Sequence, residues 1–297
     1  MNYQHVFHAG NFADVHKHVA LTRILDHLLA KPTAFRVIDS HAGAGLYDLR
    51  GPEAQRSGEW LAGIKRVVDA FGLGAGRAAV GTVEKTPDDA RALLAPYLDI
   101  IAAHNASSTL VVYPGSPLIV AAFLRRQDRL LACECEPRAA AALGALLRRD
   151  RRVKVLTIDG WLAVKAGVPP KERRGLVLID PPYEAGDDFA RLAETFAEAH
   201  RKWPTGTYML WYPIKERAAP DALARRLKKA IPHGSPVLRS EITLGPPRAD
   251  AGLVGSGLIL VNPPYTLAGQ LEAVLPVLAR LFGPSSAARL DWLARRV

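Results

Sequence analysis

The run Asp180-Pro181-Pro182-Tyr183 contains the residue types in this 297-residue chain that most clearly suggest chemistry. It directly follows the apolar segment 175–179, which has the length and composition of a buried strand. The Asp180 carboxylate can accept one hydrogen of a planar amino group. The Pro181 carbonyl can accept the other, because proline keeps its C=O. The Tyr183 ring offers a flat face on which a base can stack. In an enzyme that transfers methyl groups, this combination favours an exocyclic amine as the acceptor.

Three other predicted strands also end in acidic residues, namely Asp39, Glu134 and Asp159. Ligands of open α/β sheets bind beyond the carboxyl ends of parallel strands, so we expect the four acidic residues to gather at one edge. There Glu134 can accept hydrogen bonds from both hydroxyls of a ribose, and Asp159 is placed to accept one from an adenine amino group. A single carboxylate of this kind is more often a helix cap or a turn former, so the prediction depends on the ordered set of four.

A glycine-containing loop, Gly43-Ala44-Gly45, follows the first of these strands and lets the backbone approach a cofactor closely. A nicotinamide dinucleotide site is the competing interpretation, but its fingerprint needs a third glycine where this chain has Asp48. A carboxylate there would repel a pyrophosphate. S-adenosylmethionine has no phosphate and carries a cationic sulfonium, so it suits acidic surroundings better. The start of a helix at Ser116-Pro117, helped by Lys17, can bind its carboxylate.

Over nearly its whole length the chain resembles the ribosomal large-subunit methyltransferase J family, the 23S rRNA (adenine-2030-N6)-methyltransferases. The matching segments are His5 to His18, Asp39 to Gly45, Tyr113 to Pro117, Arg174 to Glu184 and Leu210 to Pro213. The resemblance implies a Rossmann-like class I methyltransferase fold, S-adenosylmethionine as the cofactor and 23S ribosomal RNA as the substrate. Because an adenine must be swung out of folded RNA to reach such a pocket, we expect protein-free RNA or an early assembly intermediate to be modified.

The resemblance also implies roles for individual residues. Asp180 is the expected catalytic residue, and Tyr3 is expected to contact the substrate together with Pro181 and Tyr183. The residues expected to contact the cofactor are Lys17, His18, His41, Ser116, Glu134, Asp159, Gly160 and Asp180. The chain departs from the family pattern mainly around residues 72–81, a difference that concerns RNA docking more than the chemistry.

Two other functions remain open at this stage. The Asp-Pro-Pro-Tyr motif would suit a DNA adenine-N6 methyltransferase equally well, although no separate DNA-reading domain is visible. A non-catalytic RNA-binding assembly factor belongs to a different class, but it would have no need of an intact acidic set.

The order of predicted elements is that of a doubly wound α/β sheet. A helix over 12–30, capped by Asn11, places Asp14, Lys17 and His18 in line with its apolar stripe. Helices near 58–71 and 86–105 interrupt the first crossover, so we expect a helical subdomain (50–110) inserted in a single domain, 1–297. The other predicted helices cover 116–127, 137–149, 187–202, 220–231 and 267–282, and the strands cover 35–39, 129–134, 153–158, 175–179, 207–212, 237–244 and 257–262.

A second motif of the same kind, Asn262-Pro263-Pro264-Tyr265, follows the last predicted strand. The loop 245–256 is too short to hold a crossover helix, so strands 237–244 and 257–262 should pair as an antiparallel hairpin. The second motif then lies at the edge of the sheet away from the cofactor, and we predict that it is not catalytic.

The chain is strongly basic, with 39 Lys and Arg against 29 Asp and Glu, a net charge of +10. Such a balance favours a polyanionic partner, most simply nucleic acid, although some basic proteins have none. Basic runs occur around 125–126, 148–154, 173–174 and 225–229. Most such runs are solvated helix faces, so we expect Lys215, Arg217 and Arg248 rather to border the cleft.

Cys133 and Cys135 are too few ligands for a zinc site, and no metal is expected. They fit a reduced protein, and neither a signal peptide nor a membrane span is visible, which predicts a cytoplasmic location.

Overall fold

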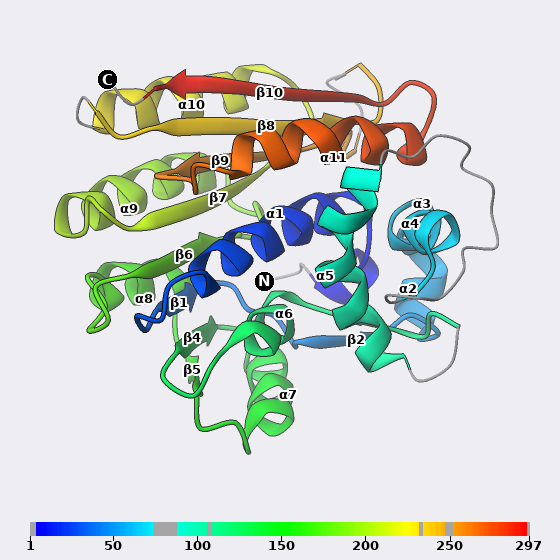
Figure 1. The fold of residues 1–297 in the computed structure, drawn as a ribbon, viewed down its shortest axis with the longest axis horizontal. Coiled ribbons are helices and arrows are strands. Elements are labelled where there is room, and N and C mark those ends of the chain that lie inside the picture. The colour runs from blue at the N-terminus through cyan, green and yellow to red at the C-terminus, as the bar shows by residue number, and fades with distance from the viewer. Residues whose placement is uncertain (1–3, 74–87, 106–108, 232–233, 247–251, 296–297) are drawn as a thin grey trace.

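The computed structural model describes residues 4–73, 88–105, 109–231, 234–246 and 252–295. Within them the main sheet has eight strands in the order β10-β8-β9-β7-β6-β1-β4-β5 (Figure 1). Their bounds are β1 Arg36–Asp39, β4 Arg129–Glu134, β5 Val153–Thr157, β6 Gly175–Ile179, β7 Thr207–Ile214, β8 Val237–Thr243, β9 Gly255–Val261 and β10 Ala287–Ala294. Strands β5, β4, β1, β6 and β7 are parallel. The chain crosses from one half of the sheet to the other between β5 and β6, so the strand order reverses between the neighbouring strands β1 and β6. This order confirms the predicted Rossmann-like class I methyltransferase sheet.

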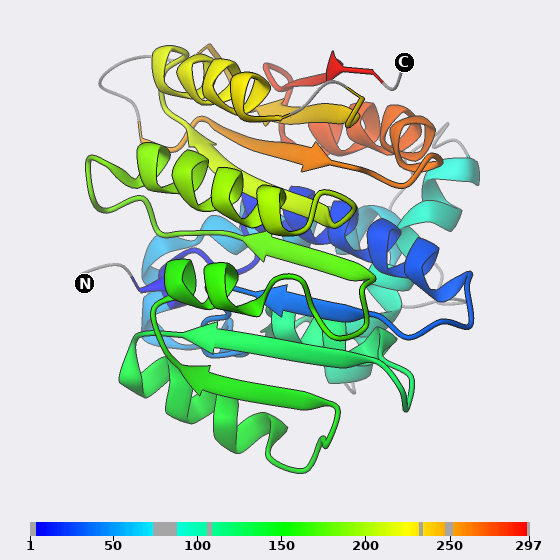
Figure 2. The same cartoon turned by 90° about the vertical axis from the view of Figure 1, so that its left-hand side faces the viewer.

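Helices cover both faces of this sheet and enclose two apolar cores. On β6 the side chains alternate, so that Leu176 and Leu178 join one core while Val177 and Ile179 join the other. The first face carries α1 (Phe12–Leu29), α6 (Ser116–Phe123), α7 (Pro137–Leu147) and α11 (Leu267–Phe282). The second carries α8 (Gly160–Gly167), α9 (Asp188–Lys202) and α10 (Ala218–Ala230), which stand in front of the strands in Figure 2.

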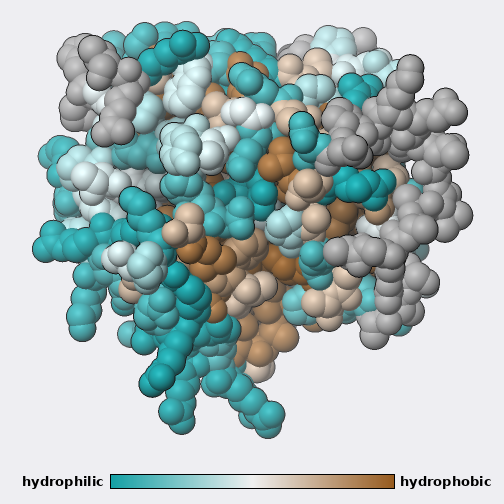
Figure 3. Space-filling model, in the orientation of Figure 1, coloured by the Kyte–Doolittle hydropathy of each residue, from teal (hydrophilic) through white to brown (hydrophobic). Residues whose placement is uncertain are grey.

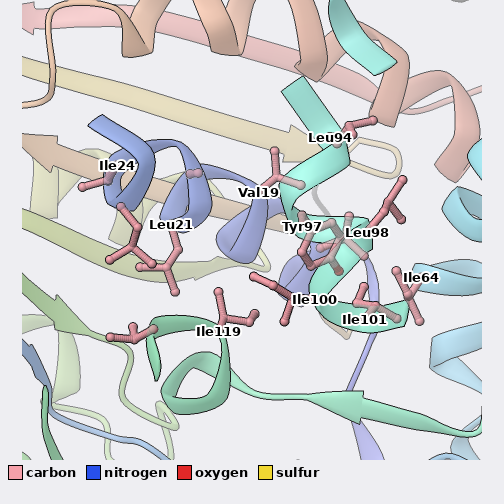
Figure 4. Packing of buried hydrophobic residues seen from close by; sticks show 14 of the residues in the cluster. Val19, Leu21, Ile24, Ile64, Leu94, Tyr97, Leu98, Ile100, Ile101 and Ile119 are labelled. Atoms are coloured by element: carbon pink, nitrogen blue, oxygen red, sulfur yellow. The ribbon is translucent and has the colours of Figure 1, made fainter. Parts of the chain in front are cut away.

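Helix α1 runs through the middle of the first core, and it begins directly after Asn11, the predicted cap. The Asn11 side chain accepts hydrogen bonds from the backbone N–H groups of Ala13 and Asp14, which satisfies two donors of the first turn. Figure 4 shows Val19 and the next turns of α1 packed against α6 and against helix α5 (Asp88–His104). Because neighbouring helices surround it, the polar residues of its first turns are buried too.

The block between β1 and β4 consists of short elements around α5. They are β2 (Leu46–Asp48), α2 (Pro52–Ser57), α3 (Glu59–Ala62), α4 (Ile64–Phe71) and β3 (Val112–Pro114). The short helix η1 (His5–Phe7), which precedes α1 in the chain, packs beside α2. Strands β2 and β3 form a small antiparallel sheet that the sequence did not predict. Ile64 and Tyr97 of this block belong to the same core as α1 (Figure 4). The division into an inserted subdomain stays a prediction.

The expected direction of the last strands is confirmed. Strand β9 is antiparallel to both β7 and β8, so its carboxyl end lies at the amino end of β7. There the Asn262 side chain donates hydrogen bonds to the carbonyls of Pro204 and Gly206, each at 2.8 Å. Asn262 and Asp180 therefore lie at opposite edges of the sheet.

The elements missing from the prediction also include α8 and β10. Strand β10 pairs with β8 at the edge of the sheet, where Asp291 accepts two hydrogen bonds from the buried Arg239. Across the ranges that the structure describes, no helix combines the length and apolar character that crossing a bilayer requires.

Candidate active site

A cavity of about 1130 Å³ opens at the carboxyl ends of β1, β4, β6 and β7. Eight of the predicted site residues line it together: Lys17, His18, His41, Ser116, Glu134, Asp180, Pro181 and Tyr183. They come from five different parts of the chain, namely α1, the loop after β1, α6, β4 and the loop after β6. The topology thus brings together residues that are far apart in the sequence.

Two predicted site residues have a different placement. In the described part of the chain, Asp159 and Gly160 are not among the residues that line this cavity. The exposed Asp159 carboxylate caps α8 by accepting a hydrogen bond from the Leu162 backbone N–H and lies 3.5 Å from Arg191. At Gly160 a Cβ would lie 2.0 Å from the Ser40 carbonyl oxygen, so only glycine lets α8 start here. Tyr3 lies outside the described residues.

A row of charged side chains crosses the cavity floor from the N-terminal segment to Asp180. His5 Nε2 lies 3.0 Å from Asp14 Oδ2, and Lys17 Nζ lies 3.0 Å from Asp14 Oδ1. The Lys17 ammonium also forms an ion pair with the Asp180 carboxylate. Lys17 thus links the carboxylate of α1 to the carboxylate of the predicted catalytic motif.

Both α1 members of this row keep their charge. Burial alone would raise the pKa of Asp14, but His5 and Lys17 hold that pKa well below its usual range. Burial opposes the charge of Lys17, yet Asp14 and Asp180 raise its pKa above the ordinary value. Asp14 Oδ2 also accepts the Gly10 backbone N–H at 2.9 Å. The row is a fixed ionic structure beneath the N-terminal segment.

His18, the neighbour of Lys17, is held by two tyrosines instead of charges. The Tyr113 hydroxyl lies 2.7 Å from His18 Nδ1 and 2.9 Å from the Tyr97 hydroxyl, and all three residues are buried. Burial lowers the pKa of His18 to about 3, so the imidazole is neutral. Tyr97 belongs to α5, so the block between β1 and β4 contacts the site.

The hydrogen-bond row fixes the tautomer of His18. Tyr113 is the one hydrogen-bond partner of the Tyr97 hydroxyl among the described residues. If Tyr97 donates to Tyr113 and Tyr113 donates to Nδ1, every hydroxyl hydrogen is used. The reverse direction would leave the buried Tyr97 hydrogen without an acceptor, at a cost of about 1–3 kcal/mol. The proton of His18 therefore resides on Nε2, as a donor.

The glycine loop after β1 is bound to the end of β4. The Gly43 backbone N–H donates to Glu134 Oε2 at 2.8 Å, and the Glu136 backbone N–H donates to Oε1 at 2.8 Å. Gly43 has a φ of +65°, and a Cβ there would lie 2.2 Å from the Tyr47 hydroxyl. The Gly43 backbone thus lies close to Tyr47 and fixes the Glu134 carboxylate at the cavity wall, while its close approach to a cofactor stays a prediction.

Asp39 lies just behind this wall. Its Oδ2 accepts a hydrogen bond from the Ser116 hydroxyl at 2.7 Å, while its Oδ1 is buried without a hydrogen-bond partner among the described residues. Burial raises the pKa of Asp39 to about 7. Ser116 thus connects a buried carboxyl group to the cavity surface, where α6 begins.

The two aromatic positions of the site are rigid. The Tyr183 hydroxyl donates to the Trp211 carbonyl at 2.7 Å, and its ring packs against Phe189 and Trp211 at centroid distances of 4.7 and 5.6 Å. On the other side of the cavity, His41 meets the edge of Trp161 at 5.2 Å, and burial lowers its pKa to about 4. Both rings present faces whose positions are set by neighbours.

Comparisons with known proteins agree with this geometry. A family model described as "Ribosomal RNA large subunit methyltransferase D, RlmJ" matches residues 32–294. The chain is 36% identical over 296 residues to the Ribosomal RNA large subunit methyltransferase J of Haemophilus influenzae, covering 99% of both chains. The chain belongs to the ribosomal RNA large subunit methyltransferase J family.

Two further relatives support this membership. The Escherichia coli (strain K12) protein of the same name is 36% identical over 300 residues and is matched over 99% of both chains. A crystal structure of a Legionella pneumophila protein is 35% identical and superimposes with a TM-score of 0.83, covering 96% of this chain and 98% of that one.

The cavity of this methyltransferase fits a cationic cofactor. Acidic residues line it, among them Asp14, Glu134 and Asp180, and Lys17 offsets part of the charge of Asp14 and Asp180. A sulfonium and an ammonium group are favoured beside such carboxylates. The His18 Nε2–H and the start of α6 at Ser116 are donors for a carboxylate of the same ligand. The residues present therefore suit S-adenosylmethionine.

Sequence reasoning also missed residues of the site. Tyr47 reaches back under the glycine loop, where its hydroxyl accepts the Ala44 backbone N–H at 3.2 Å, and Trp211 lies below the Lys17 ammonium. Lys215 lines the cavity as expected, whereas Arg217 turns away to pair with Glu241. Arg248 lies outside the described residues. An aromatic residue two positions after the glycine loop was the available signal for Tyr47.

Proposed function

We propose that this chain binds S-adenosylmethionine in the cavity and methylates N6 of an adenine in 23S ribosomal RNA, at position 2030 by family resemblance. The observation that carries the proposal is the position of Asp180-Pro181-Pro182-Tyr183 in the same cavity as Glu134 and the glycine loop. Membership of a family of large-subunit ribosomal RNA methyltransferases supports RNA as the substrate.

The roles of the residues follow from their chemistry. S-adenosylmethionine, when bound, supplies an electrophilic methyl group on a cationic sulfur. The N6 lone pair of adenine is delocalised into the ring, so the amine is a poor nucleophile. Asp180 and the Pro181 carbonyl each accept one amino hydrogen, which favours tetrahedral character at N6 as the N–C bond forms. The proton lost from N6 goes to Asp180 or to water.

Positioning supplies much of the acceleration. Tyr183 is anchored by its hydroxyl to Trp211, so its ring forms a rigid platform for the extruded base. Lys17 holds the Asp180 carboxylate in place through its ion pair, with Asp14 and His5 behind it. Glu134 accepts the ribose hydroxyls, while Lys17, His18, His41 and Ser116 complete the cofactor contacts. Asp159, Gly160 and Tyr3 remain predicted contacts.

The need to extrude the target adenine indicates which form of the RNA is modified. A rigid pocket between α1 and the β6 loop requires the adenine to leave its stack, which costs less in RNA that assembly has not yet fixed. We therefore propose protein-free 23S ribosomal RNA or an early assembly intermediate as the substrate, in the cytoplasm.

The experiment that tests the function is mass spectrometry of ribosomal RNA adenines from cells with and without this chain. The expected result is one N6-methyladenine of the large-subunit RNA that disappears with the protein and returns with the wild-type gene. Unchanged ribosomal RNA together with loss of N6-methyladenine from DNA would support the alternative DNA methyltransferase instead. If an Asp180→Ala variant restored this N6-methyladenine, the result would point to a non-catalytic assembly factor.

A further inference from the structure

The positive charge of this protein is concentrated at the edge of the sheet that faces away from the cavity. Four segments lie at the amino ends of four neighbouring parallel strands and include the first residues of three of them: 31–36 at β1, 124–129 at β4, 148–154 at β5 and 171–174 at β6. Together they contain thirteen Lys and Arg against three Asp and Glu. This excess of ten equals that of the whole chain, where 39 basic residues face 29 acidic ones. The remainder of the chain is therefore balanced in charge.

The four segments form one continuous surface. Arg125 donates to the carbonyls of Lys31 and Thr33, and Arg174 also donates to the Thr33 carbonyl. Arg152 donates to the Leu124 carbonyl, and Arg36 pairs with Glu172. These bonds join each segment to the next one in the order of the strands. In Figure 2 the strands β6, β1, β4 and β5 point the same way, so these segments meet at one end of the sheet.

Apart from Arg36, which pairs with Glu172, the basic residues of this edge fall into two groups. Arg125, Arg129, Arg152 and Arg174 donate to backbone carbonyls at the ends of α1 and α6 and nearby turns, so they stabilise the fold. Eight others are exposed, and among the described residues their side chains have no hydrogen-bond or ion-pair partner. They are Lys31, Arg126, Arg148, Arg149, Arg151, Lys154, Lys171 and Arg173. We call these eight residues the amino-edge surface.

A structural role does not account for the amino-edge surface. Like charges crowded on one face repel one another and lower the stability of the folded state. Basic residues near helix ends gain only about 0.3–1 kcal/mol from the helix dipole when they are exposed. Ligands of open α/β sheets bind at the carboxyl ends of the strands, so this edge is also not needed for the cofactor. Figure 3 shows long hydrophilic side chains projecting where β4, β5 and α7 lie.

We propose that the amino-edge surface is a second docking site for the RNA substrate, which binds backbone phosphates of a segment distant from the target adenine. The inference rests on the proposed function, because it takes the RNA as the polyanion. The carboxyl and amino edges of a five-residue strand such as β6 are about 16 Å apart. A large folded RNA spans both edges, whereas a short stem-loop in the cavity reaches only one. This site then selects long RNA by charge without reading its sequence.

The test compares two RNAs with a triple variant, R148Q/R149Q/R151Q. Binding of full-length 23S ribosomal RNA and of a short stem-loop carrying the target adenine is measured between roughly 50 and 200 mM salt. For the long RNA, the slope of log affinity against log salt should fall by about 2–3 and the affinity by about tenfold or more. Affinity and methylation rate for the stem-loop should stay within twofold. Thermal stability should be unchanged or higher, since repulsion is relieved.

A matched control tests whether the loss of affinity depends on where the basic residues lie. The variant R225Q/R226Q/K229Q removes three exposed basic residues from α10, which packs on α9 rather than on the four segments. Its affinity for the long RNA should fall much less. An equal loss in the control, an unchanged slope in the triple variant, or an equal loss with the stem-loop would each overturn the proposal. Binding is measured without methylation, so a wild-type protein that methylates neither RNA would refute only the proposed function.

Discussion

Two nearly identical motifs end two buried strands of this molecule, Asp180 to Tyr183 after β6 and Asn262 to Tyr265 after β9. Both turns contain a residue in the left-handed region, Tyr183 at φ +53° and Asn262 at φ +51°. Yet β6 is parallel to the central sheet and β9 is antiparallel, so the motifs lie at opposite edges. Strand direction, rather than the residues of the motif, decides which one meets the cavity.

The surroundings of the two motifs also differ, because one borders the cavity and the other closes a turn. Asp180 faces an ammonium group in a cavity, whereas the Asn262 amide donates both of its hydrogens to backbone carbonyls. Tyr183 is packed beneath Trp211, and Tyr265 is 87% exposed. One motif keeps its acceptors available for a ligand, while the other uses its polar groups to close a turn.

The largest effect should come from Asp180→Ala. Removing the carboxylate should lower the methylation rate by about 10²–10⁴-fold, the range typical for a positioned acid–base group. Cofactor affinity should fall far less than the rate, because Asp180 faces the acceptor amine and Asp14 and Glu134 still line the cavity. Titration calorimetry with S-adenosylhomocysteine and a methylation assay check the two halves. Asp180→Asn keeps one acceptor oxygen and should fall between Ala and wild type, and full activity of the Ala variant would refute the role.

Lys17→Met should lower both activity and stability. It leaves the buried Asp14 carboxylate with less compensation, and breaking a buried pair in this way costs about 3 kcal/mol. The low pKa of Asp14 contributes stability that is present above its unfolded value of about 4 and is lost as the pH falls. The difference between variant and wild type should therefore be largest at neutral pH and shrink in acid, as urea denaturation at several pH values can show.

Lys65→Met is the matched control for this variant. Lys65 pairs with Asp69 one turn along α4, at the protein surface, so its loss should cost at most about 0.5 kcal/mol. Equal losses for the two lysine variants would mean that the buried row is not an ionic structure.

The sequence predicted features that depend on local patterns better than contacts between residues that are far apart in the chain. Strand-end acids, the Asn11 cap and the direction of β9 follow from local patterns and loop length, so Asp180, Glu134 and the edge of Asn262 could be placed in advance. The row His18–Tyr113–Tyr97 joins residues 95 and 16 positions apart, and no local pattern encodes such a contact. The short helix α8 was missed because Asp159 and Gly160 suggested a strand end followed by a loop. At β10 the alternating Arg289, Leu290 and Asp291 carried a strand signal that went unused.

Tyr97→Phe should have a moderate effect confined to the cofactor. Without the Tyr97 hydroxyl, Tyr113 loses the hydrogen bond that it accepts but keeps Nδ1 as the acceptor for its own hydrogen, so His18 keeps its tautomer and is held less firmly. The loss of about 1 kcal/mol expected for one hydrogen bond corresponds to an affinity for S-adenosylmethionine about fivefold lower, with a nearly unchanged rate at saturation. Nitrogen-15 NMR of His18 should show protonation at Nε2 in both the wild type and the variant.

Tyr208→Phe provides the control for the loss of a buried hydroxyl. The Tyr208 hydroxyl donates to the carbonyls of Ala199 and Trp203 on the other face of the sheet. That variant should lose stability but keep its cofactor affinity and the His18 spectrum. A wild-type spectrum with the proton on Nδ1 would contradict the direction of the row.

The smallest effect on activity should come from Asn262→Ala, although its residue matches that of a credible amine-methylating motif. The side chain lies at the amino end of β7, and losing its two hydrogen bonds to carbonyls should cost about 1–3 kcal/mol of stability. Alanine also tolerates a φ of +51° less well than asparagine, so Asn262→Gly separates the two contributions by removing only the hydrogen bonds. Both variants should methylate at the wild-type rate and bind cofactor normally at a temperature where they are folded. A folded Asn262→Ala protein that binds cofactor but no longer methylates would place the second motif in the reaction, and the argument from strand direction would be wrong.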